Sequence, residues 1–189
     1  MPTTGTSSSY DKRTLVQARK LGLIAWLVTI SLLLSIGTSA ATSVGGIPPR
    51  INIAASNGLS SENYTTAGSV VFIDVMLLAQ DATPFGSDVY VLILSPDGQA
   101  TSLLVDQPPP FFNRVPALVT GRPVPLLANV VLDKDTGGRL AISNFAAGGR
   151  QGWYVICGLI VAAGRDPGDP KQWASSSFFP ILVTPATGQ

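Results

Sequence analysis

The stretch that decides the fold is GWYVICGLIVAAGRDPGDPKQW, residues 152–173. It opens with the apolar run GWYVICGLIVAA (152–163), in which large and small side chains alternate and which holds the chain's one cysteine, Cys157. An apolar run that is followed by Gly, Asp and Pro predicts a buried strand and its turn. Cys157 lies between Ile156 and Gly158, a setting in which a thiol packs as a small hydrophobic group. A reactive thiolate would need an electropositive and partly exposed position.

Short apolar segments separated by turn residues continue on both sides of this stretch. The clearest is a hairpin, in which Val89–Leu94 and Ala100–Val105 flank the turn Ser95-Pro96-Asp97-Gly98. In such a turn the proline fixes φ and the glycine accepts a positive φ. The same pattern predicts further strands at 51–56, 70–79, 126–133, 139–145 and 176–185. The segment 107–125 has too many prolines to form a central strand.

These segments predict an all-β fold: an immunoglobulin-like or Greek-key β-sandwich of about seven or eight strands, preceded by one N-terminal hydrophobic helix. We expect the sandwich domain at 68–189, after a linker at 42–67 that contains a possible first strand. The expected domain is large enough to bury a core without disulfides.

Three of these stretches carry a resemblance to a known kind of module. DVYVLILSPDGQ (88–99), the opening stretch and FFPILV (178–183) resemble a recurrent module of secreted bacterial surface proteins. The resemblance covers roughly residues 68–184. It implies an immunoglobulin-like sandwich that is usually attached to larger surface proteins, and it implies no catalytic activity.

The N-terminal segment, residues 1–41, has the three parts of an export signal. Four basic residues precede LGLIAWLVTISLLLSIG (21–37), and small residues follow it, so that cleavage after Ala40 or Ala41 is expected. The alternative is an uncleaved membrane anchor, although an apolar run of 17 residues is short for a spanning helix. Both interpretations send the rest of the chain across the membrane, because the early positive charges keep the N-terminus inside.

Composition removes several classes of function. The chain has no histidine and one cysteine, so that histidine-based catalysis, a disulfide within the chain and a cysteine-based zinc site are excluded. No Lys/Arg cluster follows residue 20, which argues against nucleic-acid binding. We therefore expect no enzyme activity and no cofactor.

A few residues remain as candidate sites. Asp133 and Asp135 have the spacing of a calcium loop, but the fifth and twelfth positions hold Gly137 and Asn144, so that a hairpin turn is favoured and calcium stays a weak candidate. Phe111 and Phe112 follow three prolines and form either an exposed docking ridge or a plug at one end of the sandwich. The aromatic residues proposed as sugar-stacking platforms or as core are Tyr90, Trp153 and Trp173.

The sequence favours an exported, non-catalytic protein with a binding or structural role at the cell surface or in the periplasm. The partner-binding candidates are Phe111, Phe112 and Trp173, with strand addition at an open sheet edge as another mode. The partner is expected to be a protein or glycan of the cell envelope, with membrane contact through 21–37 only if that segment is uncleaved. Two alternatives remain: a carbohydrate-binding or carbohydrate-active module, and a membrane-anchored subunit of an envelope or filament complex.

Overall fold

Eleven strands and one short 3-10 helix form the described part of the chain, which comprises residues 48–58, 63–79 and 85–186 of the computed structural model. In chain order they are β1 (Arg50–Ser56), β2 (Tyr64–Thr66), β3 (Val71–Leu78), β4 (Ser87–Leu94), β5 (Ala100–Leu104), β6 (Phe111–Arg114), β7 (Ala117–Thr120), β8 (Leu127–Val130), β9 (Thr136–Ile142), β10 (Gly152–Ala162), the helix Pro170–Gln172 and β11 (Trp173–Thr184).

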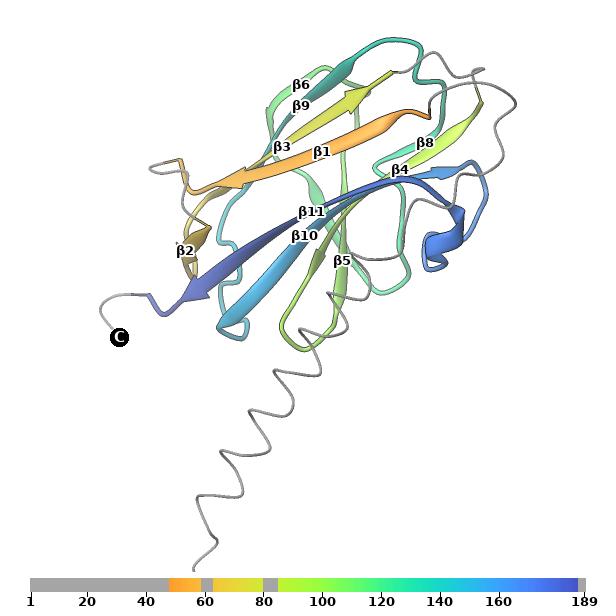
Figure 1. Ribbon diagram of the computed structural model, residues 1–189. Coiled ribbons are helices and arrows are strands. Elements are labelled where there is room, and N and C mark those ends of the chain that lie inside the picture. Colours follow the sequence, from red (N-terminus) through yellow and green to blue (C-terminus); the bar gives the residue numbers. More distant parts are fainter. Residues whose placement is uncertain (1–47, 59–62, 80–84, 187–189) are drawn as a thin grey trace, which may run out of the picture. The chain divides into compact units, whose positions relative to one another are not determined.

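The strands form two sheets that pack face to face (Figure 1). Sheet A has the order β1-β3-β9-β6, and sheet B has the order β2-β11-β10-β4-β5-β7, with β8 pairing to β4 beside β5. Most neighbours are antiparallel, but β2 runs parallel to β11 and β6 runs parallel to β9. The described residues are therefore all-β, as the sequence predicted, and the two parallel pairs make both sheets mixed.

The core lies between the sheets because alternate residues of each strand point into it. In β3 the inward residues Val71, Ile73, Val75 and Leu77 are buried, whereas the intervening side chains are partly or largely exposed. Strands β4 and β10 are buried on both faces, which explains why their sequences are nearly continuous apolar runs.

Part of the outer face of sheet B is covered by the chain between β7 and β8. Ser102 lies next to the core residue Leu103 in β5 and points the opposite way. The backbone nitrogen of Val124 donates a hydrogen bond to Ser102 Oγ at 2.9 Å. This contact holds the proline-rich segment against the sheet and leaves Ser102 only 2% exposed.

The two sheets meet along β1 and β11 through serine side chains. The backbone nitrogens of Ile51 and Ile53 donate hydrogen bonds to Ser175 Oγ (3.1 Å) and Ser177 Oγ (3.0 Å). These nitrogens belong to the outer edge of β1, beside which sheet A has no further strand among the described residues. The serines therefore satisfy backbone donors that an edge strand would otherwise leave available for pairing with another chain.

Three expectations need correction or remain outside the structure. The described residues contain more strands than the predicted seven or eight, and the sandwich includes β1 and β2, so that it begins before Gly68. The proline-rich segment 107–125 does hold strands, β6 and β7, but both lie at sheet edges, where missing donors cost least. The predicted N-terminal hydrophobic helix and the export signal fall in residues 1–47, outside the described residues. Within the described ranges, no helix has the length and apolar character needed to span a bilayer.

Candidate functional site

Phe111 and Phe112 are adjacent in β6 but have opposite roles. Phe111 is 2% exposed and belongs to the core, whereas Phe112 is 78% exposed. The sequence left a plug and a ridge as alternatives for the pair, and the structure divides them: Phe111 plugs the core and Phe112 stands on the surface. An exposed fraction this high is unusual for a phenylalanine and marks a candidate contact residue.

The backbone of β6 fixes this arrangement. Asn113, the next residue, has φ +48°, a left-handed conformation that asparagine tolerates better than most residues. The pairing of β6 with β9 is irregular between Phe111 and Arg114, as in a β-bulge, which redirects side chains relative to the sheet. Gly138 of β9 allows the close pairing, because a Cβ atom there would lie 2.1 Å from the carbonyl oxygen of Phe111. The outward position of Phe112 is thus set by the local chain geometry.

Two open surface hollows flank Phe112. One, of about 830 Å³, lies between the edge strands of the two sheets and is lined by Leu104, Val105, Pro110, Phe112, Val115 and Ala117. The other, of about 810 Å³, lies over β3 and β9 and is lined by residues that include Met76, Phe112, Gly137 and Arg139. Val115 and Met76 are 72% and 53% exposed. We call Met76, Phe112 and Val115 the Phe112 patch.

An ion pair lies in the second hollow. Arg139 contacts both carboxylate oxygens of Asp74, with Nε to Oδ1 at 2.6 Å and Nη2 to Oδ2 at 2.9 Å. The two residues are cross-strand partners in β9 and β3, and the Arg139 guanidinium also lies 5.8 Å from the centre of the Phe72 ring. The hydrogen bonds to Asp74 raise the pKa of Arg139. Both side chains are about half exposed, so the pair mainly fixes a charged wall of the hollow.

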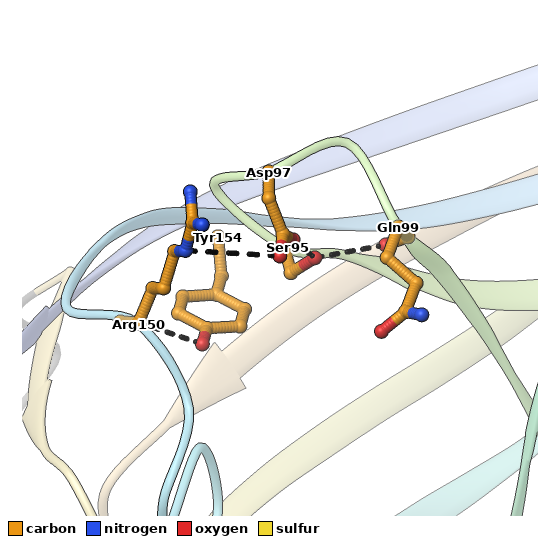
Figure 2. Close-up of polar contacts among 5 residues, drawn as sticks. All are labelled: Ser95, Asp97, Gln99, Arg150 and Tyr154. Atoms are coloured by element: carbon orange, nitrogen blue, oxygen red, sulfur yellow. Dashed lines mark hydrogen bonds and ion pairs between the residues drawn. The ribbon is translucent and has the colours of Figure 1, made fainter.

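The opposite end of the sheets has a polar corner (Figure 2). Tyr154 Oη donates a hydrogen bond to the backbone oxygen of Arg150 at 2.8 Å, and Arg150 Nε lies 4.0 Å from Asp97 Oδ2. In the β4–β5 turn, Ser95 Oγ contacts both Asp97 Oδ1 and the backbone oxygen of Gln99. The hydrogen bond from Ser95 lowers the pKa of Asp97, and burial raises the pKa of Tyr154. A hollow of about 320 Å³ opens here, with Ile93, Ile142 and Phe145 among its apolar walls.

The remaining sequence candidates have internal roles. Cys157 is 2% exposed, and burial raises the pKa of its thiol to about 12, so the native thiol is protonated at neutral pH. Trp173 is half-buried: its Nε1 donates to the backbone oxygen of Pro167 at 2.8 Å and its ring lies 6.1 Å from that of Phe178. Tyr90 is buried at 4% exposure on the outer face of sheet B, and its pKa is raised mainly by that burial.

Asp135, one of the two weak calcium candidates, accepts a hydrogen bond that stabilises the fold. Asp135 and Asp133 are both exposed, and Asp135 Oδ1 accepts a hydrogen bond from the backbone nitrogen of Ala79 at 2.9 Å. This contact ties the β8–β9 turn to the end of β3. Among the described residues, no three Asp, Glu, His or Cys side chains gather closely enough to hold a metal ion.

Six of the exposed large apolar residues are not identified by the sequence patterns, namely Tyr64, Val70, Met76, Val115, Leu118 and Val131. Met76 lies in a strand that reads as core, and only its position in the alternation of β3 places it outside. Trp153, by contrast, was named as a possible stacking residue and is 47% exposed.

Neither a protein-family model nor a curated protein matches this sequence. Among solved structures, the chain is similar to the CARDB domain of a Pyrococcus furiosus protein, solved in complex with di-metal ions. The two are 10% identical, and the match covers 79% of this chain and 99% of the other at a TM-score of 0.41.

Proposed function

We propose that this protein is an exported, non-catalytic, immunoglobulin-like β-sandwich that binds a protein partner of the cell envelope through the Phe112 patch. The exposure of Phe112 between two surface hollows carries the proposal. Aromatic side chains that enter a partner's pocket often supply much of the binding energy of an interface. The pairing of β6 with β9 favours this role, because a backbone that is already positioned loses less entropy on binding.

The immunoglobulin-like assignment has two supports. In immunoglobulin notation, β1, β3 and β9 take the places of strands A, B and E in sheet A, and β11, β10, β4 and β5 take those of G, F, C and C′ in sheet B. The sheet edges depart from that pattern, because β2 is added in parallel beside β11 and β6 runs parallel to β9. Tyr154 lies near the start of β10, the F strand of this assignment, and its hydroxyl bonds to the backbone four residues upstream. This is the arrangement of the tyrosine corner in immunoglobulin-like domains.

The size of the Phe112 patch favours a short segment of a partner over a broad interface. Met76, Phe112 and Val115 are each more than half exposed. Side chains of this size together offer about 300–400 Å² of apolar surface, whereas a stable interface buries about 800 Å² on each partner. An apolar segment of the partner, seated in the two hollows beside Phe112, fits this area.

Site-specific photo-crosslinking tests the proposal in the cell that makes the protein. A photoreactive residue replaces Phe112 in the full-length chain, and the same residue at Val131, which is 52% exposed and lines neither hollow, serves as the matched control. We expect one discrete adduct from position 112 alone. The cross-linked protein, identified and purified, should then bind the Phe112→Ala variant at least about tenfold more weakly than wild type. No adduct, or equal adducts from both positions, would contradict the proposal.

Export rests on the N-terminal sequence pattern. The mass of the exported protein distinguishes the two forms: cleavage after Ala40 or Ala41 supports a released domain, whereas an intact chain supports the membrane-anchored subunit of an envelope complex. Protein found only in the cytoplasm would contradict export.

A further inference from the structure

Two exposed aromatic residues lie in line across three strands of sheet B. Trp153 of β10 pairs with Leu182 of β11, and Leu182 pairs in turn with Tyr64 of β2. All three point away from the core, because the adjacent residues on their strands, Tyr154, Val183 and Thr65, are buried. The strands β2 and β11 lie side by side at this end of the sheet (Figure 1). We call Tyr64, Leu182 and Trp153 the aromatic row.

The row forms a flat apolar floor. Tyr64 and Trp153 are 48% and 47% exposed, and Leu182 between them is half-buried. Neighbouring strands lie about 4.8 Å apart, so the two aromatic residues, two strands apart, are about 10 Å from each other along the row. Both side chains lie on the same face of one sheet, so strand pairing fixes the spacing of their Cα atoms.

Neutral polar side chains border the floor. Thr66 and Thr184 are cross-strand partners two residues beyond Tyr64 and Leu182, and they lie on the same face as the row. Thr184 Oγ1 donates to the backbone oxygen of Thr65 at 3.2 Å, which leaves its oxygen lone pairs as acceptors. Gln151 is exposed two residues before Trp153. None of these side chains is charged.

We propose that the aromatic row binds a neutral glycan, in which two sugar rings of one extended chain stack on Trp153 and Tyr64. A pyranose ring has an apolar C–H face, which packs on an aromatic ring, and hydroxyl groups at its edge, which need donors and acceptors of the kind that Thr66, Thr184 and Gln151 provide. The aromatic row lies on a different set of strands from the Phe112 patch, and the glycan proposal does not depend on that patch.

The small apolar area of the aromatic row and the lack of charge at its border favour a neutral glycan over a protein or a charged ligand. Two half-exposed rings offer about 200 Å² of apolar surface, a quarter of what a stable protein interface buries on each side. The bordering side chains Thr66, Thr184 and Gln151 carry no charge, and the neighbouring Arg150 is paired with Asp97, so the border favours a neutral ligand over a phosphorylated or acidic one. A neutral sugar chain needs neither a large area nor a charge.

Affinity electrophoresis of the full-length protein tests the proposal. The gels contain, one at a time, hydroxyethyl cellulose, xylan, glucomannan, glycol chitin and dextran, and titration calorimetry with the matching hexasaccharide then gives the dissociation constant. We expect retardation by at least one of the polysaccharides. Trp153→Ala and Tyr64→Ala should each weaken binding by about tenfold or more, and Trp153→Phe should retain most of it because the stacking surface remains.

Phe112→Ala is the control, since it removes an exposed aromatic residue that lies outside the aromatic row. Although Phe112 is more exposed than Trp153 or Tyr64, its removal should leave glycan binding unchanged, just as Trp153→Ala should leave the cross-link at position 112 unchanged. Circular dichroism checks that each variant keeps its β-sheet spectrum. Retardation by none of the polysaccharides, or wild-type retardation of folded Trp153→Ala and Tyr64→Ala, would overturn the proposal without affecting that for the Phe112 patch.

Discussion

Gly158 of β10 lies directly against Ile53 of β1, so that a Cβ atom on the glycine would be 2.5 Å from Ile53 Cγ1 and 2.8 Å from Ile51 Cδ1. Side chains from one sheet therefore occupy the space that a side chain of the other sheet would need. Gly158 interrupts an otherwise apolar strand for this reason, and it lets the isoleucines of the edge strand reach the middle of sheet B.

Replacing Gly158 with alanine should lower the free energy of unfolding by about 1–3 kcal/mol, because the added methyl group overpacks the core. Urea denaturation measures the change. Ile53→Ala alone should cost about 2–5 kcal/mol, but the double variant should cost at least about 1 kcal/mol less than the sum, since the smaller residue makes room for the new methyl. Additive costs would show that the two residues do not share this space.

The serines that join the sheets should each contribute to stability. Ser175→Ala or Ser177→Ala leaves a backbone nitrogen of β1 without its acceptor, and we expect a loss of about 1 kcal/mol for each. Ser176→Ala, between them and exposed, is the control and should change stability by less than about 0.5 kcal/mol. If Ser176→Ala proves as costly as the other two, strand propensity and not the hydrogen bonds would account for the effect.

Mutation of the two neighbouring phenylalanines should change the free energy of unfolding by very different amounts. Phe111→Ala removes a core side chain and should lower the free energy of unfolding by about 3–5 kcal/mol. Phe112→Ala removes a surface side chain and should change it by less than about 0.5 kcal/mol. Thermal or urea denaturation of both variants provides the measurement. A large loss for Phe112→Ala would mean that this residue serves packing, and its value as a binding residue would fall.

Tyr154→Phe should cost about 1 kcal/mol, because the backbone oxygen of Arg150 loses its hydrogen-bond donor while the ring remains in place against Phe145. Urea denaturation at neutral pH measures this loss. Unchanged stability would show that water replaces the hydroxyl at this corner without penalty.

Burial of Cys157 should make the protein less stable at alkaline pH. Its pKa is raised from 9.0 to about 12 in the folded protein, so the unfolded chain loses this proton first. The stabilising effect is complete below pH 9 and is lost as the pH rises from about 9 to 12. Between pH 8 and 10, the free energy of unfolding should fall more steeply for wild type than for Cys157→Ala. Equal slopes, or rapid alkylation of the native thiol at pH 8, would contradict the burial of Cys157.

Much of the fold follows from local patterns in the sequence. The Pro-Asp-Gly turn places the β4–β5 hairpin within one residue or two of its observed ends, since the turn chemistry acts over four residues. The strands β6 and β7 were missed because proline lowers the expectation for a strand, and only the three-dimensional position of a segment shows that it is an edge.

The candidate sites were less predictable, for a physical reason. Whether Phe112 or Phe111 is exposed depends on the conformation of Asn113 and on the space at Gly138, which lies 26 residues further along the chain. The aromatic row depends on the register between β2, β11 and β10, whose residues come from distant parts of the sequence. Trp153 could be named as an aromatic candidate, but its alignment with Tyr64 needs the paired sheet.

The serine bridges between the sheets also set an order of events during synthesis. Ile51 and Ser175 are separated by 124 positions, as are Ile53 and Ser177, so the first strand finds its acceptors only when almost the last strand has left the ribosome. Until then the backbone nitrogens of Ile51 and Ile53 lack these serine acceptors, and β1 can pair with another chain. Contacts between such distant residues also make folding slow.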